Sequence, residues 1–226
     1  MGISKMSILG SDYIGAFTVA TDKFAVLARM VSHGERARIE KELEVKSITF
    51  DLDNSDLIGI YMAANSRAII LPNILEEREI AHFKKEAREE LDVEVEIFKS
   101  SLNALGNNIL VNDKFALINP EYTLEEAKSL EEIFGVESIR MKIGGFSTLG
   151  ANNILTNKGM VLNNRATDKE VDEIKEIFKN FQPSQSTANL GSLSIGLSTI
   201  ANSKGLIAGD STTGFELARI SDGLDL

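Results

Sequence analysis

Residues that could act as nucleophiles or bases are scarce in this sequence. Cysteine does not occur, and there are two histidines, His33 and His82. Because nucleophilic catalysis needs a nucleophile beside a base, a cysteine enzyme is excluded. His82 lies among alternating charges and His33 precedes a glycine, so both are interpreted as surface histidines. The absence of thiols also excludes disulfides and zinc–thiolate sites.

Two segments resemble ligand-binding loops. DLDNSDLIG at 51–59 resembles the start of a calcium loop, but Asp56 and Met62 stand where an EF-hand needs glycine and glutamate. GSLSIGLS at 191–198 has the glycine spacing of a phosphate-binding loop, but Leu197 replaces the required lysine. The paired carboxylates elsewhere are typical of solvated helix faces. No cofactor or metal is therefore expected.

The composition is that of an ordinary globular protein. The 226 residues are 43% hydrophobic and 26% charged. Lys plus Arg is 24 and Asp plus Glu is 34, which gives a net charge of −10. An acidic surface repels phosphate, so basic proteins are favoured as partners over nucleic acid. Neither a signal peptide nor a membrane span is predicted, and a cytoplasmic location is expected.

Five segments align as internal repeats, each with an apolar residue followed by glycine. The glycines are Gly15, Gly59, Gly106, Gly150 and Gly196, spaced by 44, 47, 44 and 46 residues. A polar turn follows each glycine by six or seven residues, as in NSR at 65–67 or NDK at 112–114. Two short apolar runs around a tight polar turn predict a β-hairpin in each repeat. The glycines are expected in these strands, where they permit close backbone approach.

Charged stretches between the hairpins carry helical periodicity. Apolar residues recur at spacings of three and four at 80–91 and 171–181, and Thr123 with Glu126 forms a capping-box pattern before a helix to Phe134. A shorter helix is predicted at 35–43 and another from about Thr213. Alternating runs at 45–50, 93–98 and 136–143 predict a third strand in three repeats.

The repeats predict a closed ring. The fifth unit has no third strand of its own, whereas the segment 5–9 is a strand without a hairpin. Joining them removes two free edges. We therefore predict one α/β domain: a five-bladed propeller with pseudo-fivefold symmetry, closed by the N-terminal strand. An open row of repeats is the alternative. The repeats are placed at about 1–53, 54–98, 99–143, 144–188 and 189–226.

Neutral amides cluster after two of the glycines. Asn107 and Asn108 follow Gly106, and Asn152 and Asn153 follow the next repeat's Ala151. They are interpreted either as a polar surface around the ring or as side chains that satisfy backbone groups.

The sequence resembles archaeal translation initiation factor 6 over its whole length. The resemblance rests on LNALGNNILVND at 102–113, TLGANNILTNKG at 148–159 and STANLGSLSIGLSTIANSKGLIAGDSTTGFEL at 186–217. It implies the pentein fold and a non-enzymatic function. Family members bind the large (50S) ribosomal subunit on its intersubunit face and prevent subunit association, and eukaryotic relatives also act in large-subunit maturation.

The resemblance also implies where the partner binds. The expected partners are basic ribosomal proteins near the sarcin–ricin loop, with limited direct rRNA contact, and the protein is expected to be a monomer. Residues after the repeat glycines are implied as the ribosome-binding face. Carried over by position, these are Ile60, Asn107, Ala151, Asn152, Ala188 and Asn189.

Two other functions were weighed. Pentein enzymes act on arginine-like substrates with a cysteine nucleophile, which this chain lacks. A ring scaffold that binds some other protein through the same face is compatible with composition and spacing.

Overall fold

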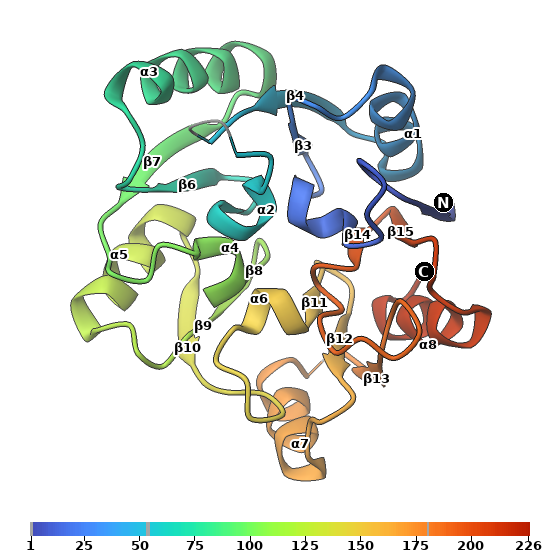
Figure 1. Ribbon diagram of the computed structural model, residues 1–226. Helices are drawn as coiled ribbons and strands as arrows, with labels where there is room; N and C mark the ends of the chain where they lie inside the picture. The colour runs from blue at the N-terminus through green and yellow to red at the C-terminus, as the bar shows by residue number, and fades with distance from the viewer. Residues whose placement is uncertain (1, 53–54, 180) are drawn as a thin grey trace.

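Five small sheets of three strands each surround a common axis (Figure 1). The computed structural model describes residues 2–52, 55–179 and 181–226, so the predicted repeat boundary at 53/54 lies outside the described residues. The sheets consist of β2 (Thr18–Ala20), β3 (Phe24–Ala28) and β4 (Lys46–Phe50); β5 (Ala63–Ala64), β6 (Ala68–Pro72) and β7 (Glu94–Phe98); β8 (Ile109–Val111), β9 (Phe115–Ile118) and β10 (Glu137–Arg140); β11 (Ile154–Leu155), β12 (Met160–Asn163) and β13 (Ser184–Ser186); and β14 (Thr199–Ala201), β15 (Gly205–Gly209) and β1 (Gly2–Met6). The predicted count of five blades is confirmed.

Each sheet combines a hairpin with a parallel third strand. In the first sheet, Val26 of β3 pairs with Val19 of β2 in antiparallel and with Ile48 of β4 in parallel. All five residues of β3 are buried, because sheet neighbours and helices cover both faces. This is why the central strands are apolar throughout rather than alternating.

A helix connects the hairpin to the third strand in four repeats and ends the chain in the fifth. The helices are α1 (His33–Leu43), α3 (Glu77–Glu86, continued by a π-helical turn at Ala87–Leu91), α5 (Leu124–Phe134), α7 (Asp168–Ile177) and α8 (Gly214–Leu224). The capping box of Thr123 and Glu126 forms as predicted. Because α7 ends at Ile177, Phe181 lies beyond the helix, where it still stacks on Phe178 with ring centroids 5.3 Å apart.

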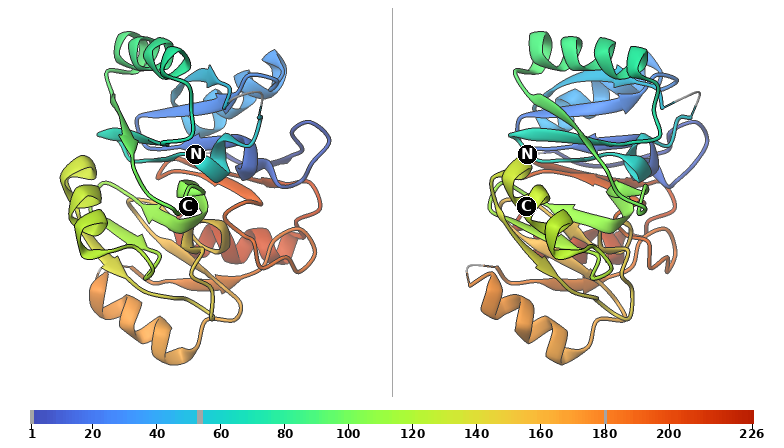
Figure 2. Two further views of the ribbon diagram at one scale, coloured as in Figure 1. Left: turned by 60° about the vertical axis from the view of Figure 1, so that its left-hand side comes forward. Right: turned by 90° about the vertical axis from the view of Figure 1, so that its left-hand side faces the viewer.

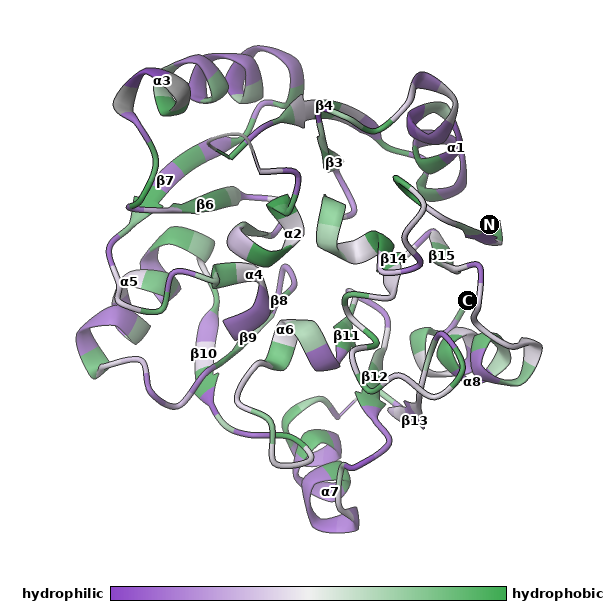
Figure 3. Ribbon diagram, in the orientation of Figure 1, coloured by the Kyte–Doolittle hydropathy of each residue, from purple (hydrophilic) through white to green (hydrophobic). Residues whose placement is uncertain are grey.

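The helices form the outer rim of the ring (Figure 1), and α1 and α8 also contact the sheet of the preceding repeat. α1 packs on β15 and β1 as well as on β4, and α8 packs on β12 and β13. Side views show α3 and α7 at opposite outer edges (Figure 2). Hydrophilic residues dominate the outward sides of these two helices (Figure 3). α1 and α8 therefore pack between neighbouring blades, while the outward sides of the helices face solvent.

The repeat glycines lie in single helical turns, so the prediction that they lie in strands is wrong. These turns are Ile14–Phe17, α2 (Ile58–Tyr61), α4 (Leu105–Asn108) and α6 (Leu149–Asn152), with a hydrogen-bonded turn at 194–198 in the fifth repeat. Side chains stabilise them locally: the Nδ2 of Asn153 donates to the carbonyl oxygen of Leu149, 2.9 Å away. Such side-chain-to-backbone bonds favour a turn over an extended strand.

The N-terminal strand belongs to the fifth sheet. β1 pairs in parallel with β15, with Gly2 opposite Gly205 and Met6 opposite Gly209. The ammonium group of Lys5 donates to the carbonyl oxygens of Asp210 and Thr212 at 2.9 and 3.0 Å. β1 thus occupies the position that β4 has in the first sheet. Strand β13 of the fourth sheet was not predicted.

Candidate functional site

The repeat glycines bring the backbones of neighbouring repeats into contact around the axis. A Cβ atom on Gly59 would lie 1.9 Å from the carbonyl oxygen of Gly15, and one on Gly15 would lie 2.3 Å from that of Gly196. A Cβ atom on Gly106, Gly150 or Gly196 would likewise lie 2.1, 2.0 or 1.9 Å from the carbonyl oxygen of the preceding repeat glycine. No side chain fits this approach, so the interpretation that the glycines serve packing is confirmed.

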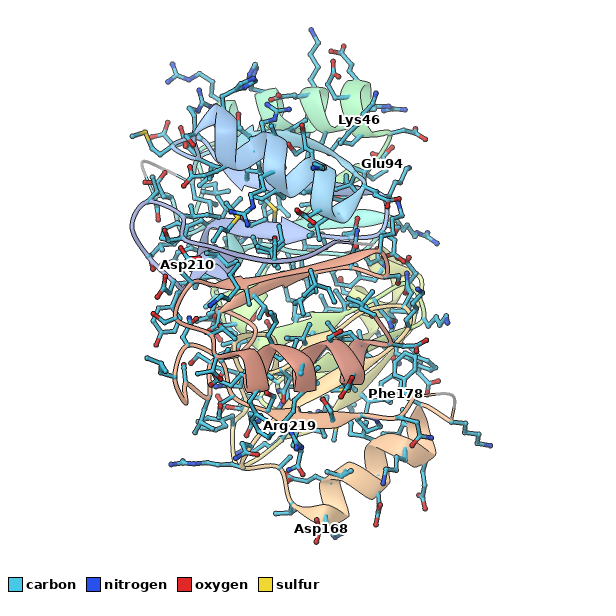
Figure 4. The ribbon with its side chains drawn as sticks, turned by 90° about the vertical axis from the view of Figure 1, so that its right-hand side faces the viewer. Lys46, Glu94, Asp168, Phe178, Asp210 and Arg219 are labelled. Atoms are coloured by element: carbon cyan, nitrogen blue, oxygen red, sulfur yellow. The ribbon has the colours of Figure 1, made fainter. Side chains whose placement is uncertain are left out.

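These glycines define one end of the ring. We call this end the glycine face: the five glycine turns together with the loops at 8–13, 55–57, 99–104, 143–148 and 188–194. The opposite end, the turn face, consists of the hairpin turns at 21–23, 65–67, 112–114, 156–158 and 202–204. Asp210 and Phe178 mark the two ends, on opposite sides of the molecule in Figure 4.

An axial cavity of about 130 Å³ lies between the two faces. It is lined by the repeat glycines, by residues of the innermost strands β2, β5, β8, β11 and β14, and by Asn153. None of its described lining residues is titratable. His33 and His82 are exposed on α1 and α3, as predicted, and do not line the cavity. The side-chain hydroxyls among the described lining residues are those of Thr18 and Thr199.

Ile60 and Asn107 follow the glycines of the second and third repeats and lie on the glycine face. Both side chains are half-buried. The helical turns α2 and α4 that carry them contact each other, so the two residues occupy equivalent positions in adjacent blades. Among the described atoms, the buried Oδ1 of Asn107 has no hydrogen-bond partner.

Ala151 and Asn152 are buried, which contradicts their expected exposure. The side-chain amide of Asn152 donates to the carbonyl oxygen of Leu193 at 3.2 Å, and its Oδ1 accepts from Thr148 at 2.7 Å. The interpretation that Asn152 contributes to an exposed polar surface is therefore wrong. Its side-chain amide instead joins the fourth repeat to the loop of the fifth.

Asn108 and Asn153 are buried as well. The Oδ1 of Asn108 accepts from Asn119 at 2.7 Å, and that of Asn153 accepts from the backbone N–H of Asn163 at 3.1 Å. The alternative interpretation, that these amides satisfy backbone and neighbouring polar groups, is correct for both.

Ala188 is fully buried and Asn189 is half-buried in a loop that joins two repeats. The Nδ2 of Asn189 donates to the carbonyl oxygen of Asp12 at 2.8 Å, and its Oδ1 accepts from Thr212 at 2.9 Å. The side chain of Ala188 is therefore not exposed on the glycine face, contrary to expectation, and Asn189 fixes the loop to the first repeat.

Apolar residues exposed on this face were not predicted from the sequence. Leu9, Tyr13 and Leu190 are 44%, 43% and 74% exposed. The hydroxyl of Tyr13 lies 3.4 Å from that of Ser192, so the loops of the first and fifth repeats adjoin. Leu9 and Leu190 have left-handed φ angles. The glycine that follows each of them is the sequence signal that could have indicated these turns.

Charge on the glycine face is sparse and buried carboxylates are satisfied. Burial is the largest influence on the Glu216 carboxyl and raises its pKa. Together, hydrogen bonds from Thr213, Thr187 and Gly191 outweigh the effect of burial and leave the pKa below its ordinary value.

Among the described residues, no group of three or more His, Cys, Asp or Glu side chains could hold a metal. No helix in the described part of the chain is long and apolar enough to cross a membrane.

The five three-stranded sheets form an α/β fold whose neighbours among solved structures are pentein enzymes. Solved structures of dimethylarginine dimethylaminohydrolase share the fold, including a Pseudomonas aeruginosa enzyme complexed with citrulline. This structure has a TM-score of 0.56 and 12% identity, and the match covers 96% of this chain and 88% of that one. An adduct of the enzyme with S-methyl-L-thiocitrulline matches equally, with a TM-score of 0.56 and 97% of this chain covered. At this identity the likeness shows the fold alone.

Sequence comparison identifies the family. The model of the eIF-6 family matches residues 3–223. Translation initiation factor 6 of Thermococcus onnurineus (strain NA1) is 36% identical over 225 residues, which cover 99% of this chain and 98% of that protein. The corresponding factor of Methanocaldococcus jannaschii is 37% identical over 218 residues, covering 96% and 95%. The chain belongs to the eIF-6 family.

Proposed function

We propose that the protein binds the large ribosomal subunit through its glycine face and sterically blocks the small subunit. Family membership supports the ribosomal partner. The observation that carries the non-catalytic mechanism is the axial cavity, whose described lining has no titratable group. At the corresponding place a pentein enzyme needs a nucleophile and a base.

The glycine face suits a protein partner. It presents apolar side chains and backbone loops, with few charges between them. The chain as a whole has a net charge of −10, which favours basic ribosomal proteins as partners and disfavours direct contact with rRNA. The family resemblance implies that these proteins lie near the sarcin–ricin loop. Stable binding needs an interface of roughly 1,600 Å² in total, about half of it from each partner.

The proposal includes a monomer that acts in the cytoplasm without a cofactor, with large-subunit maturation as a further role. β1 closes the ring in this account, because its pairing with β15 joins the two ends of the repeat array. A non-catalytic ring that binds another protein through the glycine face is the second candidate.

Sucrose-gradient sedimentation with purified archaeal ribosomal subunits tests the proposal. We expect the protein to travel with the large subunit and to lower the yield of joined ribosomes. Co-sedimentation without inhibition would favour maturation over anti-association. Failure to bind either subunit would overturn the ribosomal proposal and leave the scaffold alternative.

A further inference from the structure

The carboxylate of Glu216 holds a helix and a loop at once. Its side chain is buried, with the residue 6% exposed. One oxygen, Oε2, accepts from the backbone N–H and the hydroxyl of Thr213 at 2.8 and 2.9 Å, which caps α8. The other, Oε1, accepts from the hydroxyl of Thr187 at 2.7 Å and the N–H of Gly191 at 2.9 Å. The second pair of bonds clamps the loop at 187–191.

The same clamp recurs in weaker form in other repeats. Glu170 caps α7 and accepts from the N–H of Gly144 at 3.1 Å, and Glu126 caps α5 and accepts from Ser100. Glu35 caps α1 and accepts from the N–H of Ser32, but no described residue of the 8–13 loop donates to it. The first repeat therefore offers a capping glutamate without a loop clamp.

The clamped loop has an unfavourable backbone. Asn189, Leu190 and Gly191 have φ angles of +47°, +62° and +99°. A leucine in this region of φ is strained and persists only where surrounding contacts impose it. Here the Glu216 and Asn189 hydrogen bonds impose it, and the result is a leucine held 74% exposed on the glycine face.

Two further exposed apolar side chains lie in segments that adjoin this loop in sequence or space. Phe215, next to Glu216, is 72% exposed, and Tyr13 lies in the adjoining loop. Three acids adjoin the loop: Glu216, which accepts from Gly191, Asp12, whose carbonyl oxygen accepts from Asn189, and the exposed Asp210. Two cations lie beside the same groups, because Lys5 donates to the carbonyl oxygen of Asp210 and Arg219 lies over the ring of Phe215. Carboxylates beside an apolar patch repel RNA phosphates and suit an apolar segment of a basic protein.

We propose that Glu216 is a positioning residue for ribosome binding: it fixes the 187–191 loop so that Leu190 is presented as an apolar anchor to a basic protein of the large subunit. This inference rests on the proposed function. A loop that is already fixed in the free protein does not lose conformational entropy when the partner binds, which favours affinity.

The test measures dissociation constants for purified archaeal large subunits with four variants. Leu190→Ala and Glu216→Ala should each weaken binding about tenfold, whereas Glu35→Ala, which also removes a capping glutamate, should not weaken it. The double variant should be little weaker than Leu190→Ala, because Glu216 acts through Leu190. Amide hydrogen exchange at Gly191 should accelerate in Glu216→Ala while the core strands stay protected.

The outcomes separate the two proposals. If wild type does not bind, both fail. If wild type binds and Leu190→Ala binds equally well, the anchor is wrong while the proposed function stands. Additive losses in the double variant would show that Glu216 acts independently of Leu190 and would overturn the positioning role. Should Glu216→Ala fail to fold, Thr187→Val removes one bond of the loop clamp and leaves the helix cap intact. Combining Thr187→Val with Leu190→Ala should then weaken binding little more than Leu190→Ala alone, and additive losses would again overturn the positioning role.

Discussion

The side-chain amide of Asn202 donates a hydrogen bond to the carbonyl oxygen of Leu43, 2.9 Å away, and so ties the hairpin turn of the fifth repeat to the end of α1 in the first. The same Nδ2 donates to the carbonyl oxygen of Thr21 at 3.0 Å. Asn65 of the second repeat does the same two blades further on, donating to Asn112 and Phe134 at 3.3 and 3.0 Å. These asparagines satisfy helix-terminal carbonyls that would otherwise be buried without donors.

Asn202→Ala should therefore destabilise the fold strongly. Asn202 is 2% exposed, and its Oδ1 also accepts from the N–H groups of Lys204 and Gly205. Losing these bonds should cost about 3 kcal/mol. The melting temperature should fall by roughly 6–12 °C in a chain of this size. Ser203→Ala is the matched control, because the buried Ser203 hydroxyl has no partner among the described residues. Equal stability of the two variants would contradict the role of Asn202.

Gly106→Ala should prevent stable folding. Its Cβ would lie 2.1 Å from the carbonyl oxygen of Gly59 and 2.5 Å from that of Met62, and both are backbone atoms that cannot move aside. We expect a loss of more than about 4 kcal/mol in the free energy of unfolding, or no folded protein. Gly34→Ala is the control: a Cβ there meets nothing within 4 Å, and α1 should gain about 0.5–1 kcal/mol. A stable Gly106→Ala variant would mean that the blades can separate at the axis.

The repeat register could be predicted because it repeats in the sequence itself. The glycine and the polar turn stand at fixed positions in all five units, so the hairpins and their order followed directly. Strand β13 was missed because its sequence, SQS, has no apolar alternation. It is a strand because its backbone pairs with β12 and α8 packs on it, which no local pattern records.

The site was harder to predict, because exposure depends on partners distant in sequence. Asn152 was expected on the surface, yet Leu193 of the next repeat accepts its amide hydrogen bond. Leu190 would be expected in the core from its side chain alone. It is exposed because Glu216, 26 residues later, fixes a left-handed loop. Local composition contains neither relationship.

Acid should loosen the clamp at Glu216. Its pKa is lower in the folded chain than the ordinary 4.5, so the ionised carboxylate stabilises the folded state above that value. This stabilisation is lost as the pH falls through the lowered pKa. Glu216→Gln should thus be less stable than wild type at neutral pH, and the difference should shrink below about pH 4.5. Chemical denaturation between pH 7 and 3 measures it, and parallel curves for the two proteins would contradict the prediction.

Removing β1 should open the ring. Deletion of residues 2–6 exposes the edge of β15 and removes both hydrogen bonds of Lys5. An unpaired strand edge invites pairing with another chain. The shortened protein should unfold at a lower temperature and elute as larger species in size-exclusion chromatography. Lys5→Met keeps the strand and should cost about 1–3 kcal/mol while remaining a monomer. If the shortened protein unfolds like the full chain, β1 does not close the ring.

Asn107→Arg should weaken binding to the large subunit while leaving the fold intact. The Oδ1 of Asn107 has no hydrogen-bond partner among the described residues, so losing the amide should cost little stability. An arginine there places a long cation on a face proposed to meet basic proteins, and like charges should reduce the affinity at least about tenfold. Lys158→Glu is the control, because Lys158 is exposed on the turn face. Sedimentation with archaeal large subunits and thermal unfolding measure the two effects separately. Normal binding by Asn107→Arg would place the interface away from this part of the glycine face, and weaker binding by Lys158→Glu would move it to the turn face.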